Sequence, residues 1–219
     1  HCAGAARRPR PVVCAVWAPP PGAGALGPGP WRAGLMGRGP WLKAGWLAGL
    51  PIAVKDLIEV AGVRTTWGSP IHAEHISTHS DYLVERLEDN GAIIIGKSNT
   101  PEFGAGSHTF NEVFGHTHNP WNTSLSAGGS SGGSAASLAA GQVWLATGSD
   151  LGGSLRNPAS FCSIVGLRPS PGRVAHGPTS LPFNDLSVDG PMGRNIADLS
   201  LIHICRCRRY SLCRSRWSR

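Results

Sequence analysis

The chain holds 219 residues, of which 41% are hydrophobic and 15% charged, the composition of a globular protein with one sizeable core. It has no run of about 18 apolar residues, which excludes a segment that spans a bilayer. The formal net charge is +7, but the basic excess lies in residues 1–50 and 201–219, while residues 51–200 hold eight basic and thirteen acidic residues. A nucleic-acid partner is therefore not expected, because phosphates need basic residues on folded structure.

The first 46 residues are rich in Gly and Pro, in clusters that interrupt any helical or alternating pattern. We interpret this segment as a low-complexity leader or as a wrong-frame translation of GC-rich DNA, and we find no export signal in it. The cysteines form no disulfide framework, since five of the six lie in the two ends of the chain. Both observations predict a cytoplasmic protein.

From residue 47 the sequence alternates apolar runs with turn signals. The predicted elements are, in chain order, a strand over 52–54, a helix over 81–90 that is entered at Ser80 and stopped by Gly91, a strand over 92–95, a helix over 131–140, and strands over 143–147 and 164–167. Segment 119–124 has the composition of a loop. Alternating helices and apolar strands predict an α/β fold whose loops carry the candidate chemistry.

The last residues, 199–219, form a basic tail rich in Cys and Arg. Cys205 and Cys207 alone lack the second pair of ligands that a zinc site needs. Residues 199–204 resemble the translation of a sequencing adapter, so we expect the tail not to be native gene sequence. The predicted domain therefore covers residues 47–198.

Residues 91–98 match the pattern of a phosphate-binding loop, in which glycine amides wrap a phosphate and a lysine, here Lys97, reaches its outer oxygens. That motif follows a strand, whereas a helix is predicted before Gly91. The inner residues 92–95 are also strand formers rather than loop formers. We therefore interpret the match as coincidental.

Residues 128–132 match the sharp turn that exposes the nucleophilic serine of α/β-hydrolases, here Ser130. The turn requires a strand before it, and the preceding segment is predicted to be a loop. A triad built on this pattern would use His176 with Asp150 or Asp185. An α/β-hydrolase is therefore the alternative class of enzyme.

Several histidines and one glutamate could be drawn as metal ligands, namely His72, Glu74, His75, His79, His116 and His118. No pair among them has the His-Glu-x-x-His spacing that places two imidazoles on one face of a helix. We interpret them as solvated loop residues. Neither a metal nor a cofactor is expected.

A stronger constellation consists of one lysine and two serines, each in its own conspicuous block. The blocks are 49–56 with Lys55, 128–134 with Ser130, and 148–156 with Ser154. In this order and setting they resemble the amidase signature family, and the resemblance continues over about residues 47–198. It implies a mixed β-sheet with helices on both faces, in an enzyme that hydrolyses a small-molecule amide.

A lysine and two serines can also be assigned catalytic roles from their chemistry. A serine hydroxyl is a weak nucleophile, so a base must take its proton, and a lysine can do so only when neutral. Burial beside the apolar residues 52–54 favours a neutral Lys55. The resemblance implies that Ser154 attacks the carbonyl, that Ser130 relays the proton and that Lys55 is the base, which gives an acyl-enzyme that water hydrolyses. It also implies a cis peptide bond before Ser130.

Backbone amides of the third block are candidates for stabilising the oxyanion. Leu151, Gly152 and Gly153 offer successive N–H groups, and two residues without Cβ let the backbone curl around the developing charge. The side chains expected to support the two serine loops are Ser131, Asp150 and Arg156.

The sequence is also compatible with related functions of the same family. The glutaminase subunit of the transamidosome-type enzymes, which amidate mischarged transfer RNA, shares all three blocks, whereas Leu151, Leu155 and Asn157 resemble the stand-alone amidases. Family members are considerably longer than this chain, so we expect a truncated domain, and an inactive fragment is a further alternative. For the full-length enzyme a homodimer is expected.

Overall fold

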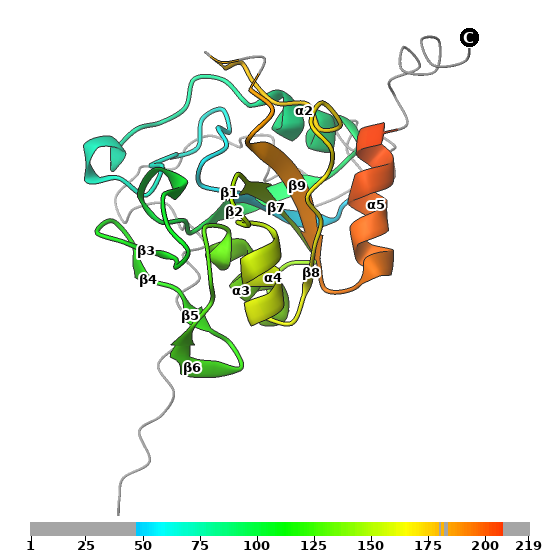
Figure 1. Cartoon of the computed structure of the whole chain (residues 1–219). Coiled ribbons are helices and arrows are strands. Elements are labelled where there is room, and N and C mark those ends of the chain that lie inside the picture. The colour runs from blue at the N-terminus through cyan, green and yellow to red at the C-terminus, as the bar shows by residue number, and fades with distance from the viewer. Residues whose placement is uncertain (1–46, 180, 182–183, 208–219) are drawn as a thin grey trace, which may run out of the picture.

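The computed structural model describes residues 47–179, 181 and 184–207, and the expectations for the first 46 residues lie outside this range. Its centre is a five-stranded sheet with the order β2-β1-β7-β9-β8 (Figure 1). The strands are β1 (Pro51–Lys55), β2 (Ile93–Ser98), β7 (Leu145–Asp150), β8 (Val165–Gly166) and β9 (Val188–Gly193). β1 is parallel to β2 and β7, whereas β9 is antiparallel to β7 and β8. The mixed sheet confirms the predicted fold class.

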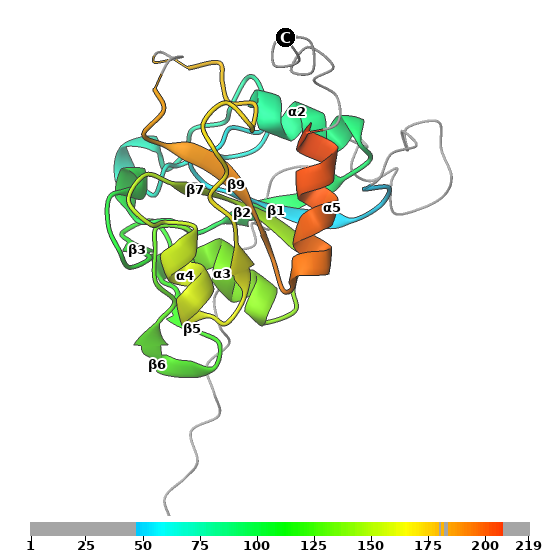
Figure 2. The same cartoon turned by 45° about the vertical axis from the view of Figure 1, so that its right-hand side comes forward.

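Helices cover both faces of this sheet, as expected. They are α2 (Tyr82–Asp89), α3 (Gly132–Ala139), α4 (Arg156–Phe161) and α5 (Ile196–Cys207), with short 3-10 turns η1 (Pro70–His72) and η2 (Glu102–Gly104). Alternation along β1 directs Ile52 and Val54 into the core formed with α2. Ala53 belongs to the second core, formed with residues of α3 and α4. Figure 2 shows these two helices side by side. Lys55 follows the alternation of Ala53, so its side chain lies on the α3 face.

Two short ribbons lie outside the sheet, β3 (Phe110–Asn111) with β4 (Gly115–His116) and β5 (His118–Asn119) with β6 (Asn122–Ser126). The loop predicted over 119–124 is therefore wrong, because the chain turns back at Pro120 and its polar residues pair backbone to backbone. A strand does precede the Ser130 turn, but it belongs to a ribbon. It is not a strand of the central sheet, as the α/β-hydrolase turn would need.

The other differences concern element ends and several missed elements. Asp81, not Ser80, caps α2, and its Oδ1 accepts a hydrogen bond from the Leu83 amide at 2.7 Å. β2 and β7 run further than predicted because they continue as long as their neighbours pair with them. Sequence patterns missed α4, α5 and β9 as elements, together with the short β3 and β4 and both 3-10 turns, and α5 crosses the expected domain boundary at residue 198.

The small residues at the start of α3 allow it to approach the chain that leaves β2. A Cβ added at Gly133 would lie 2.3 Å from the Asn99 backbone nitrogen, which no side chain tolerates. Next to this contact, the Ser98 and Ser134 hydroxyls lie 2.6 Å apart, and Ser134 also donates to the carbonyl of Thr147 in β7. The helix and the loop before it are thus held against the end of the sheet.

Lys97 lies inside β2 and is buried. Its Nζ is 3.1 Å from Asp56 Oδ1 and donates to Thr65 Oγ1 at 2.7 Å. Burial lowers the pKa of Lys97 to about 8, against the opposing effect of Asp56. The predicted strand in the phosphate-loop match is confirmed, and its lysine is an internal ion-pair partner.

The histidines considered as metal ligands are spread over several elements. His79 Nε2 lies 2.7 Å from Glu59, while His116 and His118 belong to β4 and β5, which corrects their placement in loops. Within residues 47–179, 181 and 184–207, no group of three or more His, Cys, Asp or Glu could hold a metal ion. In the same ranges no helix combines the length and apolar character needed to cross a membrane.

Candidate active site

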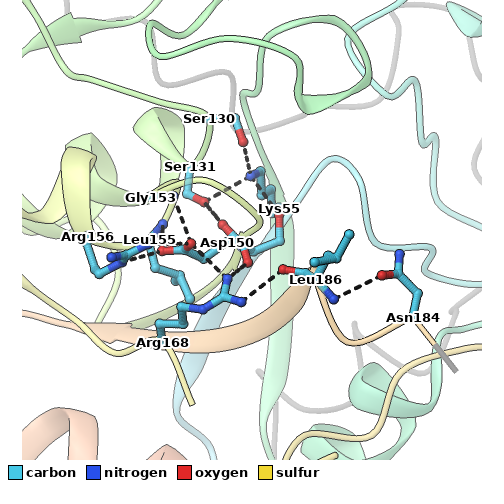
Figure 3. A network of polar contacts seen from close by, with 11 residues as sticks. Lys55, Ser130, Ser131, Asp150, Gly153, Leu155, Arg156, Arg168, Asn184 and Leu186 are labelled. Carbon is cyan, nitrogen blue, oxygen red and sulfur yellow. Dashed lines mark hydrogen bonds and ion pairs between the residues drawn. The ribbon is translucent and has the colours of Figure 1, made fainter. Parts of the chain in front are cut away.

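Lys55 is the last residue of β1 and is fully buried at the centre of the site. Its Nζ donates to the hydroxyls of Ser130 at 2.6 Å and Ser131 at 3.0 Å (Figure 3). A third hydroxyl, that of Ser149 in β7, lies 2.9 Å from the same nitrogen. The fold therefore joins the first two sequence blocks directly, as expected from the sequence.

Burial lowers the pKa of Lys55 to about 7, although Asp189 and Asp150 oppose this effect by attracting the charged form. An ordinary lysine is almost fully protonated at neutral pH. Here a large fraction of the side chain is a neutral amine, which can accept a proton from a hydroxyl. The lysine thus meets the requirement for a general base at physiological pH.

The loop before α3 presents Ser130 to this amine. The peptide bond between Gly129 and Ser130 is cis, as the family resemblance implied. A Cβ at Gly129 would lie 3.0 Å from the backbone of His108, so the close approach of these two segments favours glycine. Thr109 Oγ1 donates to the carbonyl of Gly128 at 2.9 Å and helps to hold the loop.

Ser154 lies in the loop that follows β7, beside the Ser130 loop. Its carbonyl accepts a hydrogen bond from the Ser131 amide at 3.3 Å, and the residue is half-buried. The hydroxyls that Lys55 contacts are those of Ser130, Ser131 and Ser149. Ser130 therefore lies at the lysine, and Ser154 lies in the neighbouring loop.

Asp150, at the end of β7, organises the Ser154 loop. Its carboxylate accepts from the amides of Gly153 at 2.8 Å and Leu155 at 3.1 Å (Figure 3). The supporting role expected for Asp150 agrees with these contacts. The N–H of Gly153, expected to contribute to the oxyanion site, is bound within the loop itself. Leu151 and Gly152 stay predictions for the oxyanion.

Two arginines neutralise this buried carboxylate. Arg156 and Arg168 each place a guanidinium nitrogen 3.0 Å from Asp150, and Arg168 also donates to the Asp150 carbonyl. Burial by itself would raise the pKa of Asp150, but the hydrogen bonds from Arg156, the two amides and Arg168 hold it well below its usual range. The loop is therefore anchored by a carboxylate that stays charged.

Sequence reasoning missed Ser149, Arg168 and the ion pair between His176 and Asp189. Ser149 lies beyond the strand predicted to end at residue 147, and only the continuation of β7 to Asp150 places its hydroxyl beside Lys55. Arg168 follows the strand predicted to end at 167, and only the fold brings it to Asp150. The α/β-hydrolase triad is not assembled here, because His176 pairs with Asp189 and Asp81 instead of Asp150 or Asp185.

Comparison with known proteins identifies the family. A family model described as Amidase matches residues 41–211. The A subunit of glutamyl-tRNA(Gln) amidotransferase from Saccharolobus solfataricus is 48% identical over 160 residues, which are 73% of this chain and 34% of that protein. The chain thus spans about a third of the length of this curated relative.

Solved structures give the same result. The A subunit of glutamyl-tRNA(Gln) amidotransferase from Thermotoga maritima superposes with a TM-score of 0.70 at 39% identity, covering 74% of this chain and 36% of that one. The peptide amidase of Stenotrophomonas maltophilia superposes with a TM-score of 0.69 at 33% identity, covering 77% and 35%. With the lysine, the serine loops and the mixed sheet in place, the chain belongs to the amidase signature family.

Proposed function

We propose that the site hydrolyses a small-molecule amide to a carboxylate and ammonia or an amine through a Ser-Ser-Lys triad. The observation that carries the proposal is the contact of 2.6 Å between Lys55 Nζ and Ser130 Oγ at a lysine whose pKa is about 7. A neutral amine in this position can take the proton of the hydroxyl. Ser130 then becomes the acceptor for the proton of the nucleophile Ser154 in the next loop.

In the first half-reaction, Ser154 Oγ forms a bond to the carbonyl carbon while its proton passes to Ser130 and the Ser130 proton passes to Lys55. The C–N bond breaks as the proton returns along the same route to the leaving nitrogen. Water then attacks the acyl-enzyme with the same base and releases the carboxylate. The balance needs no metal and no cofactor.

The backbone after Asp150 would stabilise the oxyanion. The amides of Leu151 and Gly152 are the donors we assign to this task, since the Gly153 amide already donates to Asp150. Leu151 and Gly152 are both exposed, so their amides can meet a substrate. Removing one such donor costs about 3 kcal/mol of transition-state stabilisation in other enzymes.

Glutaminase activity within a transamidosome-type amidotransferase is the second candidate. It is favoured by the 48% identity with the A subunit of a glutamyl-tRNA(Gln) amidotransferase. Leu151, Leu155 and Asn157 favour the stand-alone amidases. The glutaminase would act with partner subunits, whereas the stand-alone enzyme would be a homodimer in the cytoplasm. Release of ammonia from glutamine, compared with release from simple aliphatic and aryl amides, distinguishes the two.

Covalent labelling by a fluorophosphonate tests the proposed mechanism. We expect the label on Ser154, located by mass spectrometry of the modified peptide, and we expect Ser154→Ala to remove it. Ser160→Ala, in an exposed serine of α4, is the matched control and should leave labelling unchanged. A label on Ser130 would make Ser130, and not Ser154, the nucleophile and would contradict the proposal, as would an unlabelled folded chain.

The rate of this labelling should depend on pH through Lys55. Below about pH 7 the lysine is protonated and cannot act as a base, so the rate should rise about tenfold for each pH unit. Above that pH the amine is neutral and the rate should level off. The rate constant measured from pH 5 to 9 checks this, and a midpoint near the ordinary lysine value would contradict the role of burial.

A further inference from the structure

A histidine and two buried carboxylates form a charged cluster next to the site. His176 Nδ1 lies 2.7 Å from Asp189 Oδ2 and 3.6 Å from Asp81 Oδ2. Both carboxylates are buried, whereas the His176 side chain is 56% exposed. The histidine therefore lies between the two buried carboxylates and the solvent. The proposed mechanism assigns it no role.

The position of His176 is held by the backbone around it. The next residue, Gly177, donates its amide to Asp81 Oδ2 at 3.0 Å. The carbonyl of Gly177 accepts from the Tyr82 amide at the start of α2 at 2.7 Å. This segment is thus bound to the N-terminus of α2 through both polar groups of Gly177, and it presents the imidazole to Asp189.

Strand register connects Asp189 to the catalytic lysine. In the antiparallel pair of β7 and β9, Asp189 lies directly opposite Ser149. Residues opposite one another point to the same face, with Cβ atoms about 5 Å apart. The Ser149 hydroxyl is 2.9 Å from Lys55 Nζ. One strand-to-strand step therefore separates the Asp189 carboxylate from the residue that touches the lysine.

The charges that face Lys55 are the carboxylates of Asp150 and Asp189. Asp150 is paired with Arg156 and Arg168, and an arginine keeps its charge at every physiological pH. Asp189 is paired with a histidine, whose charge varies in this range. The partner of Asp189 is thus the variable element in the charge balance around the lysine.

We propose that His176 is a positioning residue for the base: as the cationic partner of Asp189, it offsets the charge of this carboxylate so that Lys55 stays available as a neutral amine. The inference rests on the proposed function for its catalytic meaning. The electrostatic coupling itself concerns named side chains and can be measured without turnover.

The contacts of Asp189 shift the pKa values of His176 and Lys55 in known directions. The hydrogen bond to Asp189 raises the pKa of His176 in spite of its partial burial, so the imidazole keeps its proton to higher pH than usual. An unneutralised Asp189 raises the pKa of Lys55. Loss of the histidine charge should therefore increase the protonated fraction of Lys55 and weaken the base.

The test is a titration of the lysine side chains by NMR after labelling of the lysine ε-carbons with carbon-13. The sequence contains three lysines, Lys43, Lys55 and Lys97, so the spectrum is simple to assign with single substitutions. His176→Asn keeps a donor near Nδ1 without the charge, and it should raise the Lys55 midpoint by about half a unit to one unit. His176→Arg keeps the charge, and its midpoint should lie at or below that of the parent.

A substitution of Asp189 tests the same electrostatic coupling between the cluster and Lys55. Asp189→Asn removes the carboxylate while it still accepts from the imidazole, so the Lys55 midpoint should fall. The Lys97 signal reports on folding, because its pairing with Asp56 lies outside the cluster. If His176→Asn does not fold, His176→Gln takes its place as the neutral variant. Lys55 midpoints in the neutral His176 variant and in Asp189→Asn that equal the parental midpoint would overturn the proposal.

These outcomes are independent of the proposed hydrolysis. A shifted Lys55 midpoint without any label on Ser154 would support the coupling and contradict the mechanism. A labelled Ser154 with an unshifted midpoint would support the mechanism and reject the role of His176.

Discussion

Lys55→Met should reduce the rate of fluorophosphonate labelling at Ser154 by about 1,000-fold, within the range that a general base contributes to catalysis. Methionine matches the length and apolar character of the lysine stem but has no basic nitrogen. The Ser130 hydroxyl then loses the amine that lies 2.6 Å away. Without this base, the proton of the proposed nucleophile Ser154 cannot be passed on through Ser130.

Folding should survive this substitution. Lys55 is fully buried, and its lowered pKa means that the charged ammonium is unfavourable there. A neutral thioether avoids this desolvation, although three serine hydroxyls lose a partner. Urea unfolding followed by circular dichroism would establish that the variant is native before its labelling rate is measured.

Arg86→Met is a suitable control because Arg86 is an exposed basic side chain on α2 whose ion-pair partner is Asp89 of the same helix. It should label at the parental rate. A Lys55→Met protein that labels within about tenfold of the parent would show that another group acts as the base.

Asp150→Ala is expected to affect both stability and reactivity. The carboxylate is completely buried, and it binds two backbone amides of the Ser154 loop as well as Arg156 and Arg168. Removing one partner of a buried ion pair typically costs about 3–5 kcal/mol, because the remaining charge is left uncompensated. Here Arg156 and Arg168, which are 58% and 26% exposed, would both lose this partner, and their contact with water should keep the cost at the lower end of that range.

The labelling rate of the folded Asp150→Ala protein should fall by about 100-fold or more, since the amides proposed to bind the oxyanion lose their anchor. Asp150→Asn should give an intermediate effect, because one amide oxygen can still accept from the loop. Asp185→Ala, in an exposed aspartate, is the matched control. Unchanged stability and labelling in Asp150→Ala would contradict the anchoring role.

Local sequence patterns predicted most of the sheet and the helices α2 and α3, but neither α4 nor α5. Apolar runs identified β1, β2 and β7, and the small-residue pattern identified α3 to within one residue at each end. The same reasoning missed β9, whose sequence contains Gly190 and Pro191 and lacks a regular apolar alternation. That strand exists because it pairs with β7 along six residues, an interaction that a local window does not contain.

The candidate site divides in a similar way. Lys55, Ser130 and Ser154 were identified because each lies in a conspicuous block of the sequence. The ion pair of Asp150 with Arg168 was not, since the arginine stands 18 residues further along the chain. Gly153 was assigned to the oxyanion on the basis of its flexible backbone, and the structure commits its amide to Asp150.

The sequence by itself determined the family resemblance and the lysine and serines proposed for the site. These depend on residue type and short spacing, which the chain carries locally. Only the tertiary structure decided which hydroxyls touch the lysine and which charges surround it. Such contacts arise from strand register and burial, and burial is what brings the pKa of Lys55 near 7 and makes His176 a partner of Asp189.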